Sequence, residues 1–262
     1  MTSSLPSLLG VIHLPALPGS PRGSGDLGVC VERAHHEARL LAAAGYDGIV
    51  IENFGDAPFF PGLVDPITTA CMTACAIAAR EASKSLALGI NILRNDARSA
   101  LAVAIASRAD FIRVNVHTGA RVTDQGLVQG LAHETLRERR GLAADRIRIF
   151  ADVDVKHSAP LAARPIGEEA HDLADRGLAD AVLVTGSGTG RAASESDLDE
   201  VLRAVHVPVY VASGVTKEGL SQVRRAHGVI VGSAIRASGR AGDPIDQELA
   251  TRFADAFRAS RH

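Results

Sequence analysis

The chain has no tryptophan, and only 3% of its 262 residues are aromatic. Its hydrophobic residues make up 46% of the sequence, so the core must consist mainly of alanine, valine, isoleucine and leucine. A chain of this length can bury a sizeable core and suits one large domain or two small ones. The sequence has no linker or shift in composition that would mark a second domain. We therefore predict one domain over residues 1–262.

Long apolar runs are also absent, and none approaches the roughly 20 residues that a helix needs to cross a bilayer. Residues 1–6 lack the basic and apolar regions of a signal peptide. A formal net charge of −2 and a pI near 6.5 give no support for binding to nucleic acid or to a membrane surface. These features predict a cytoplasmic protein without a membrane span and without a nucleic-acid partner.

Several motifs of metal and cofactor sites are missing. The three cysteines do not form a disulfide framework, and Cys71 and Cys75 lie on a predicted alanine-rich helix, where we interpret them as buried small residues. HxH and HExxH spacings are absent. The first predicted strand is not followed by GxGxxG, which makes flavin or nicotinamide oxidoreduction the weakest of the functions considered.

What the sequence does contain is a repeated strand-then-helix pattern. Apolar runs predict strands at residues 8–14, 48–52, 86–91, 111–116, 147–154, 181–185, 207–211 and 229–231. Helical periodicity predicts helices at residues 29–44, 67–83, 97–107, 127–140, 168–176, 195–204, 217–225 and 247–259. Eight such units in this length predict an α/β fold, a (β/α)8 TIM barrel. A doubly wound open sheet is the alternative, but it rarely needs eight such even units.

Charged residues lie at the end of the fifth predicted strand and directly after it, in the segment ADVDVKH, residues 151–157. Because strand side chains alternate between faces, Asp152, Asp154 and Lys156 are expected on one side. Two carboxylates and an ammonium at the end of an apolar strand are costly to desolvate unless they are paired or serve chemistry. We favour a catalytic or ligand-binding cluster, and a structural ion-pair cluster is the alternative.

The other predicted strands also end in polar residues. In TIM barrels the carboxyl ends of the strands and the loops after them build the active site. The candidates gathered there are His13, Glu52, Asn53, Asn91, Arg94, Asn95, Asp96, Arg113, Asn115, His117, Asp152, Asp154, Lys156, His157 and Thr185.

Glycine-rich loops follow the last three predicted strands. Small residues let backbone N–H groups approach an anion, and the loops after strands seven and eight are the usual phosphate site of this fold. The predicted phosphate-binding residues are Gly186, Ser187, Gly188, Ser213, Gly214, Gly232 and Ser233.

Seven stretches of the sequence resemble the BtpA/SgcQ family of (β/α)8-barrel proteins. They are residues 10–21, 91–96, 111–115, 123–126, 151–157, 184–190 and 231–233. The resemblance extends from about residue 9 to residue 235 and implies the barrel fold and the polar rim, but it does not supply a reaction. One class of the family is associated with photosystem I biogenesis, and other members lie beside sugar-metabolism proteins. His117 departs from the family, in which an apolar residue is expected.

A shorter resemblance concerns Asp154 and Lys156. Their Asp-x-Lys spacing looks like that of ribulose-phosphate-binding barrels such as orotidine-phosphate decarboxylase, in which the carboxylate and the ammonium work on a phosphosugar. The resemblance covers three residues and a shared fold.

We therefore predict an enzyme that acts on a phosphorylated sugar or nucleotide-like small molecule by isomerase, lyase or glycosyl C–N hydrolase chemistry. Proton transfer is assigned to Asp152, Asp154 and Lys156, and Arg113 and Asn115 would orient groups or stabilise negative charge. Lys156 could instead form a Schiff base. The remaining candidates are Glu52 and His157 as catalytic residues and His13, Asn91, Asn95 and Thr185 as substrate-binding residues.

Three further possibilities remain open from the sequence. A divalent cation, Mg²⁺ or Mn²⁺, could be held by Glu52, Asp152, Asp154 or His157. A non-catalytic assembly or regulatory factor is the alternative function. Homo-oligomerisation is expected, with the helix at residues 67–83 and the terminal helix, which carries Phe253 and Phe257, as candidate interfaces.

Overall fold

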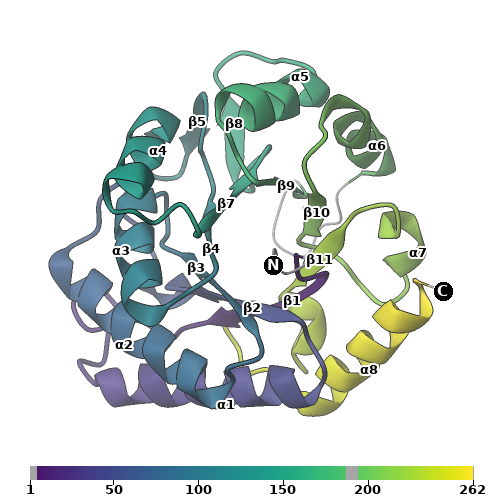
Figure 1. Cartoon of the computed structure of the whole chain (residues 1–262). Coiled ribbons are helices and arrows are strands. Elements are labelled where there is room, and N and C mark those ends of the chain that lie inside the picture. Colours follow the sequence, from purple (N-terminus) through teal and green to yellow (C-terminus); the bar gives the residue numbers. More distant parts are fainter. Residues whose placement is uncertain (1–4, 187–193, 262) are drawn as a thin grey trace.

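Eight parallel strands close into a barrel in the computed structural model, which describes residues 5–186 and 194–261. The strands are β1 (Leu8–His13), β2 (Gly48–Glu52), β3 (Ala87–Asn91), β4 (Phe111–Val114), β7 (Arg148–Asp152), β9 (Ala181–Val184), β10 (Val209–Ala212) and β11 (Gly228–Val231). Their order around the barrel follows the chain and closes where β1 pairs with β11 (Figure 1). This closed barrel of parallel strands confirms the predicted TIM barrel. Its strands are apolar runs buried on both sides, a pattern that favours parallel strands.

Helices form a ring outside the barrel (Figure 1). They are α1 (Leu27–Ala43), α2 (Pro66–Ala82), α3 (Ala97–Ser107), α4 (Ala132–Gly141), α5 (Ile166–His171), α6 (Glu195–Ala204), α7 (Leu220–Val223) and α8 (Gln247–Ala259). Short 3-10 helices lie at η1 (Phe54–Asp56) and η3 (Ser233–Ile235), and a π-helical segment, η2 (Asp172–Arg176), follows α5. Across the described ranges, none of the helices combines the length and the hydropathy needed to span a bilayer.

Three of the nine aromatic residues lie inside the barrel. Phe111 stacks on Phe150 with ring centroids 4.3 Å apart, and Phe150 lies 5.1 Å from the ring of Tyr210. These rings pack with Leu9, Ile230 and other buried side chains in a cluster separate from the larger core. The larger core, between the strands and the helices, consists mostly of alanine, valine, isoleucine and leucine, as the composition predicts.

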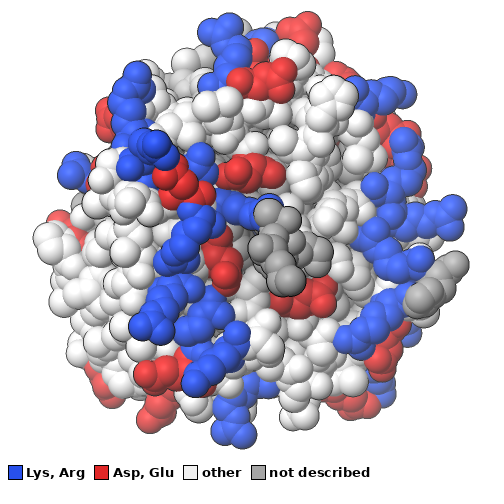
Figure 2. Space-filling model, in the orientation of Figure 1, with Lys and Arg blue, Asp and Glu red and all other residues white. Residues whose placement is uncertain are grey.

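Three carboxylates hold the strands at the face where the strands begin. Asp47, Asp110 and Asp180 precede β2, β4 and β9, and each accepts a hydrogen bond of 2.8 Å from the N–H of a residue in the neighbouring strand: Leu8, Leu88 and Ile149. Arg80 and Arg139 pair with two of these carboxylates. Acidic and basic side chains lie interspersed over this face (Figure 2). In this fold, residues at this end of the barrel serve stability.

A small antiparallel sheet corrects the prediction for residues 117–140. The sheet has the order β6-β5-β8 and consists of β5 (Ala120–Thr123), β6 (Gly126–Gln129) and β8 (Ser158–Pro160). The predicted loop therefore contains a strand, and the helix begins at Ala132 rather than at residue 127. Asp124 and Gln125 form the turn between β5 and β6, and Gly126 follows with φ of +91°, the left-handed conformation that a glycine adopts at low cost directly after such a turn.

Several predicted elements are shorter in the structure, and two of them matter most for the site. The strand at residues 147–154 ends at Asp152, where the chain bends, and the helix at residues 217–225 is reduced to α7. By contrast, α1 stops before Gly45 as predicted, and Gly45 has φ of +82°, which a residue without a side chain adopts at low cost.

Candidate active site

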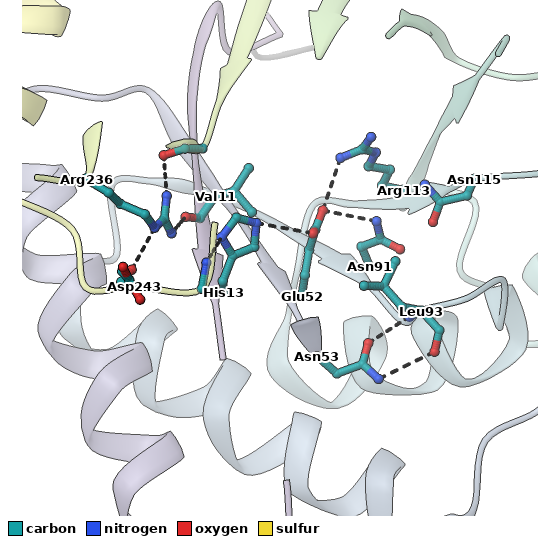
Figure 3. A network of polar contacts seen from close by, with 12 residues as sticks. Val11, His13, Glu52, Asn53, Asn91, Leu93, Arg113, Asn115, Arg236 and Asp243 are labelled. Carbon is teal, nitrogen blue, oxygen red and sulfur yellow. Dashed lines mark hydrogen bonds and ion pairs between the residues drawn. The ribbon is translucent and has the colours of Figure 1, made fainter. Parts of the chain in front are cut away.

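A buried polar network lies where the strands end, at the face that we call the mouth of the barrel (Figure 3). His13, Glu52 and Asn91 are the last residues of β1, β2 and β3, and the register pairs them side by side. Arg113 lies in β4, and Asp152 ends β7. All five residues are buried. The structure thus brings together polar residues from five strands, in agreement with the predicted rim.

Arg113 is the centre of this network. Its Nε and Nη2 donate to Oδ1 and Oδ2 of Asp152 at 3.1 and 3.0 Å, and its Nη1 donates to Oε1 of Glu52 at 3.1 Å. Burial opposes the charged guanidinium, but Asp152 and Glu52 raise the pKa of Arg113 above its ordinary value. The planar fork of arginine suits this two-carboxylate arrangement. One cation therefore offsets two buried anions.

Two amides complete the contacts of the carboxylates. Asn115 donates from Nδ2 to Oδ2 of Asp152 at 2.7 Å, and Asn91 donates from Nδ2 to Oε1 of Glu52 at 3.2 Å. The Oδ1 atom of Asn115 is buried and has no hydrogen-bond partner among the described residues. Asn115 therefore keeps an acceptor available for a ligand.

The tautomer of His13 follows from its neighbours. The N–H of Gly242 donates to Nδ1 of His13 at 3.2 Å, so the proton of the neutral ring lies on Nε2, which is 3.7 Å from Oε2 of Glu52. Burial and the cations Arg236, Lys156 and Arg113 hold the pKa of His13 well below its ordinary value. The ring packs 4.4 Å from that of Phe54, measured between centroids. His13 is thus a neutral imidazole directed at Glu52.

Lys156 lies between two cavities. The mouth cavity, of about 570 Å³, is lined by Glu52, Asn91, Arg113, Asp152 and Lys156, together with the aromatic rings of Phe54 and Phe59. A small pocket of about 60 Å³ adjoins it and shares Glu52, Phe54, Arg113 and Lys156 with it. Burial, followed by the charge of Arg113, lowers the pKa of Lys156 to about 8. A substantial fraction of this side chain is therefore neutral near physiological pH.

The small pocket contains four of the predicted phosphate-binding residues, which are Ser213, Gly214, Gly232 and Ser233. The N–H groups of Gly214 and Ser233 donate no hydrogen bond to any residue that the structure describes. Ser213 and Gly214 have φ of 104° and 65°, a conformation that is unusual for serine. Gly186 lines neither cavity, and Ser187 and Gly188 lie outside the described residues.

Three predicted site residues are directed elsewhere. Asp154 was expected beside Asp152 and Lys156, but the strand ends before it; its carboxylate, 45% exposed, lies 3.4 Å from Nη1 of Arg121. Asn95 exchanges two hydrogen bonds of 2.8 Å with the backbone of Val116. Thr185 donates to the carbonyl of Asp154. None of the three lines the mouth cavity or the small pocket, whereas His157 lines the mouth cavity.

The donor set does not suit a divalent cation. Over residues 5–186 and 194–261, no three acidic, histidine or cysteine side chains come together in a group that could hold a metal ion. At Glu52 and Asp152, the guanidinium of Arg113 lies between the two carboxylates and donates to Oε1 of Glu52 and to both carboxylate oxygens of Asp152. The set of Glu52, Asp152, Asp154 and His157 considered from the sequence is therefore not assembled as a metal site.

Some residues of the site were not identified from the sequence. Arg236 is buried and donates to the carbonyls of Val11 and Asp243 at 2.9 and 2.7 Å and to that of Gly232, and so ties β1 and β11 together below the small pocket. Phe54 and Phe59 belong to the loop after β2. The phenylalanines in that long loop were a usable signal, because aromatic residues in a loop at the mouth commonly line a ligand site. No feature of the sequence around Arg236 indicated that it belongs to the site.

Comparisons with known proteins show the family of the chain. A model of the BtpA family matches residues 5–259. The photosystem I biogenesis protein BtpA of Synechocystis sp. is 44% identical over 253 residues, which is 95% of this chain and 87% of the relative.

Solved structures share the fold at low sequence identity. Thiamine phosphate pyrophosphorylase from Pyrococcus furiosus has a TM-score of 0.60 and 15% identity, with 97% of both chains covered. Phosphoribosyl anthranilate isomerase from Thermus thermophilus has a TM-score of 0.57 and 15% identity, with 96% of this chain and 98% of the other covered. With its family match, its barrel and its polar mouth, the chain belongs to the BtpA family.

Proposed function

We propose that the protein is an enzyme that acts on a phosphorylated sugar or nucleotide-like small molecule at the mouth of the barrel. One observation carries the proposal: Lys156 lines both the mouth cavity and the small pocket of Ser213, Gly214, Gly232 and Ser233. A substrate with its phosphate in the small pocket would place its next atoms beside an amine that can accept or donate a proton. Both neighbouring structures are named for phosphate-bearing compounds, which supports the same class.

The phosphate would be held by main-chain and side-chain donors. The free N–H groups of Gly214 and Ser233 and the hydroxyls of Ser213 and Ser233 can donate to it. Lys156 and Arg113 line the same pocket and favour an anion there. The pocket of about 60 Å³ is small enough to select a compact anionic group rather than a sugar ring.

The sugar would occupy the mouth cavity, and the chemistry would be proton transfer of the isomerase, lyase or glycosyl C–N hydrolase type. Neutral Lys156 serves as the base, and Arg113 stabilises negative charge that develops on the substrate. Glu52 and Asp152 accept hydrogen bonds from substrate hydroxyls with the lone pairs that Arg113 leaves available. A Schiff base on Lys156 uses the same neutral amine.

Ligand binding can be tested with ribose 5-phosphate and ribose as a matched pair. We expect ribose 5-phosphate to raise the melting temperature and ribose to have no effect, since a ligand that binds the folded state stabilises it by mass action. Ser233→Asp should remove the shift by placing a carboxylate in the small pocket, whereas Ser221→Asp on the exposed surface of α7 should keep it. An equal shift with ribose, or a shift that survives Ser233→Asp, would contradict the phosphate site.

Turnover can be tested by deuterium exchange from solvent into bound ribose 5-phosphate or another phosphosugar that gives a thermal shift. Proton abstraction from carbon predicts exchange in the native protein and its loss in Lys156→Met. If the phosphosugar binds but no exchange or conversion occurs, the proposed proton transfer from carbon is wrong while the binding site stands.

A second candidate is a non-catalytic assembly or regulatory role, which the name of the Synechocystis relative favours. It predicts that Lys156→Met leaves the function of the protein in the cell intact, while changes on the outer surface abolish it. The buried network at Glu52, Arg113 and Asp152 argues against it, because such a network carries a desolvation cost without contributing much net stability.

A further inference from the structure

A second large cavity is lined by residues of α4, α5 and η2. α4 and α5 lie on either side of β5 and β8 (Figure 1). This side cavity has a volume of about 730 Å³, which is in the range of small-molecule sites. It is lined by the loop after β4, by residues of α4, α5 and η2, and by β5 and the segment after β8. It meets the mouth of the barrel at Asn115 and Asp152, which line both the side cavity and the mouth cavity.

His117 presents an unused acceptor to the side cavity. Its side chain is 1% exposed, and its Nε2 lies 2.8 Å from the carbonyl of Gly177. A carbonyl can only accept, so Nε2 carries the proton, and burial lowers the pKa of His117 so that the ring stays neutral. The remaining nitrogen, Nδ1, is a buried acceptor without a partner among the described residues.

Asn115 presents a second acceptor. The carboxylate of Asp152 can only accept, so the amide nitrogen of Asn115 faces it and the amide oxygen points elsewhere. This oxygen is buried without a partner in a side chain that is 6% exposed. Two unpaired buried acceptors, in two residues that line one cavity, are costly unless something donates to them. A ligand with hydroxyl or amine groups meets that requirement.

The rim of the side cavity is basic. Arg121 and Arg164 are engaged by carboxylates of Glu169 and Asp172. Arg137 and Arg176 also line the cavity, are exposed, and form no ion pair with any residue of the described ranges. The planar guanidinium groups favour a carboxylate or a phosphate. The rim therefore selects for an anionic group, while the interior selects for hydrogen-bond donors.

We propose that the side cavity is a separate binding site for a small polyol that carries an anionic group. Its hydroxyl groups donate to Nδ1 of His117 and Oδ1 of Asn115, and its carboxylate or phosphate lies at Arg137 and Arg176. The site does not depend on the reaction proposed for the mouth, because most of its lining comes from the loop after β4, from α4, α5 and η2, and from β5 and the segment after β8. It adjoins the mouth through Asn115, which donates to Asp152.

The test is calorimetric titration of the full chain with three probes: sorbitol 6-phosphate, gluconate and sorbitol. We expect at least one of the two anionic probes to bind and sorbitol to bind about tenfold more weakly or not at all, and the stronger anion identifies the preferred group. His117→Gln keeps a donor for Gly177 and removes the acceptor at Nδ1, so it should weaken binding about tenfold. Arg137→Gln, on the exposed surface of α4, should weaken binding without a change in melting temperature.

Lys156→Met, at the mouth, separates this site from the proposed substrate site and should leave the affinity of the probes within about twofold. The proposal is overturned if no probe binds at about 10 mM, since the cavity then holds water only. It is also overturned if binding survives both His117→Gln and Arg137→Gln, or if Lys156→Met abolishes it.

Discussion

The guanidinium of Arg113 forms a two-point ion pair with the carboxylate of Asp152, in which Nε lies 3.1 Å from Oδ1 and Nη2 lies 3.0 Å from Oδ2. The third nitrogen of the same group donates to Glu52 at 3.1 Å. Through this side chain β2, β4 and β7 are joined at their carboxyl ends. Arg113 therefore determines both the floor of the mouth cavity and the electrostatic balance of the site.

Replacing Arg113 with methionine should destabilise the protein strongly. Methionine fills most of the volume but leaves two buried carboxylates without their cation, and breaking a buried pair costs about 3–5 kcal/mol. Urea unfolding followed by circular dichroism measures the change in the free energy of unfolding. The control is Arg252→Met, which removes an exposed pair with Glu248 on α8 and should cost less than about 1 kcal/mol. Similar losses in the two variants would contradict the buried pairing.

Lys156 should titrate with a pKa of about 8, well below its ordinary value of 10.5. Burial is the main cause, and the neighbouring Arg113 adds to it. The chain has only three lysines, so the ¹³Cε resonances of Lys84 and Lys217, both exposed, serve as references in an NMR titration. The resonance that moves near pH 8 should be absent in Lys156→Met. If all three resonances titrated together, Lys156 would not be the base.

The same shift has a consequence for stability. The folded state binds fewer protons than the unfolded state between the folded pKa of about 8 and the unfolded value of 10.5. The free energy of unfolding contributed by Lys156 therefore increases as the pH rises through this interval. Lys156→Met removes this dependence, so the free energy of unfolding of the native protein should increase relative to that of the variant from about pH 8 to pH 10. If the free energies of unfolding of the native protein and of Lys156→Met differed by the same amount at every pH, the lowered pKa of Lys156 would be contradicted.

His13 should make the protein sensitive to mild acid. Its pKa is lowered by burial and by Arg236, Lys156 and Arg113, so the folded state resists protonation while the unfolded state binds a proton below pH 6.5. Stability should fall by about 1 kcal/mol or more from this residue as the pH drops from about 7.5 to 5.5. His13→Asn keeps an acceptor for the N–H of Gly242 and does not titrate, so it should lose less stability over that range. If His13→Asn lost as much stability as the native protein over this pH range, His13 would not be the cause of the acid sensitivity.

The barrel could be predicted because its signal is local and repeated. Each strand is an apolar run, and each polar residue that ends a strand, such as Glu52 or Asn91, is carried to the mouth by the fold itself. Lys156 was found because it follows such a run. The predicted position of Asp154, on the same side as Asp152, was wrong. Side chains alternate between faces only while the strand continues, and β7 ends at Asp152.

The parts that were missed depend on contacts distant in sequence. β5 and β6 are four residues each, and the hairpin pairs with β8, about 30 residues further along the chain. Such short polar strands carry little periodicity of their own. Likewise Arg236 follows a loop of small residues, and its role arises only because β11 lies beside β1, which brings the carbonyl of Val11 within 2.9 Å. The composition of a short segment does not contain this information.

Asp110, at the opposite end of the barrel, should affect stability and not the site. Its Oδ2 accepts hydrogen bonds from the N–H of Leu88 at 2.8 Å and from Nη2 of Arg80 at 2.6 Å. Asp110→Ala leaves the N–H of Leu88 in β3 without its acceptor, which should cost about 1–3 kcal/mol in urea unfolding. The Lys156 resonance and the binding of ribose 5-phosphate should stay as in the native protein, because Asp110 precedes β4 and the mouth lies beyond its end. Asp110→Asn keeps an acceptor oxygen and should recover part of the loss. If Asp110→Ala instead shifted the titration of Lys156, the two ends of the barrel would be coupled, and the separation of stabilising residues from site residues would be wrong.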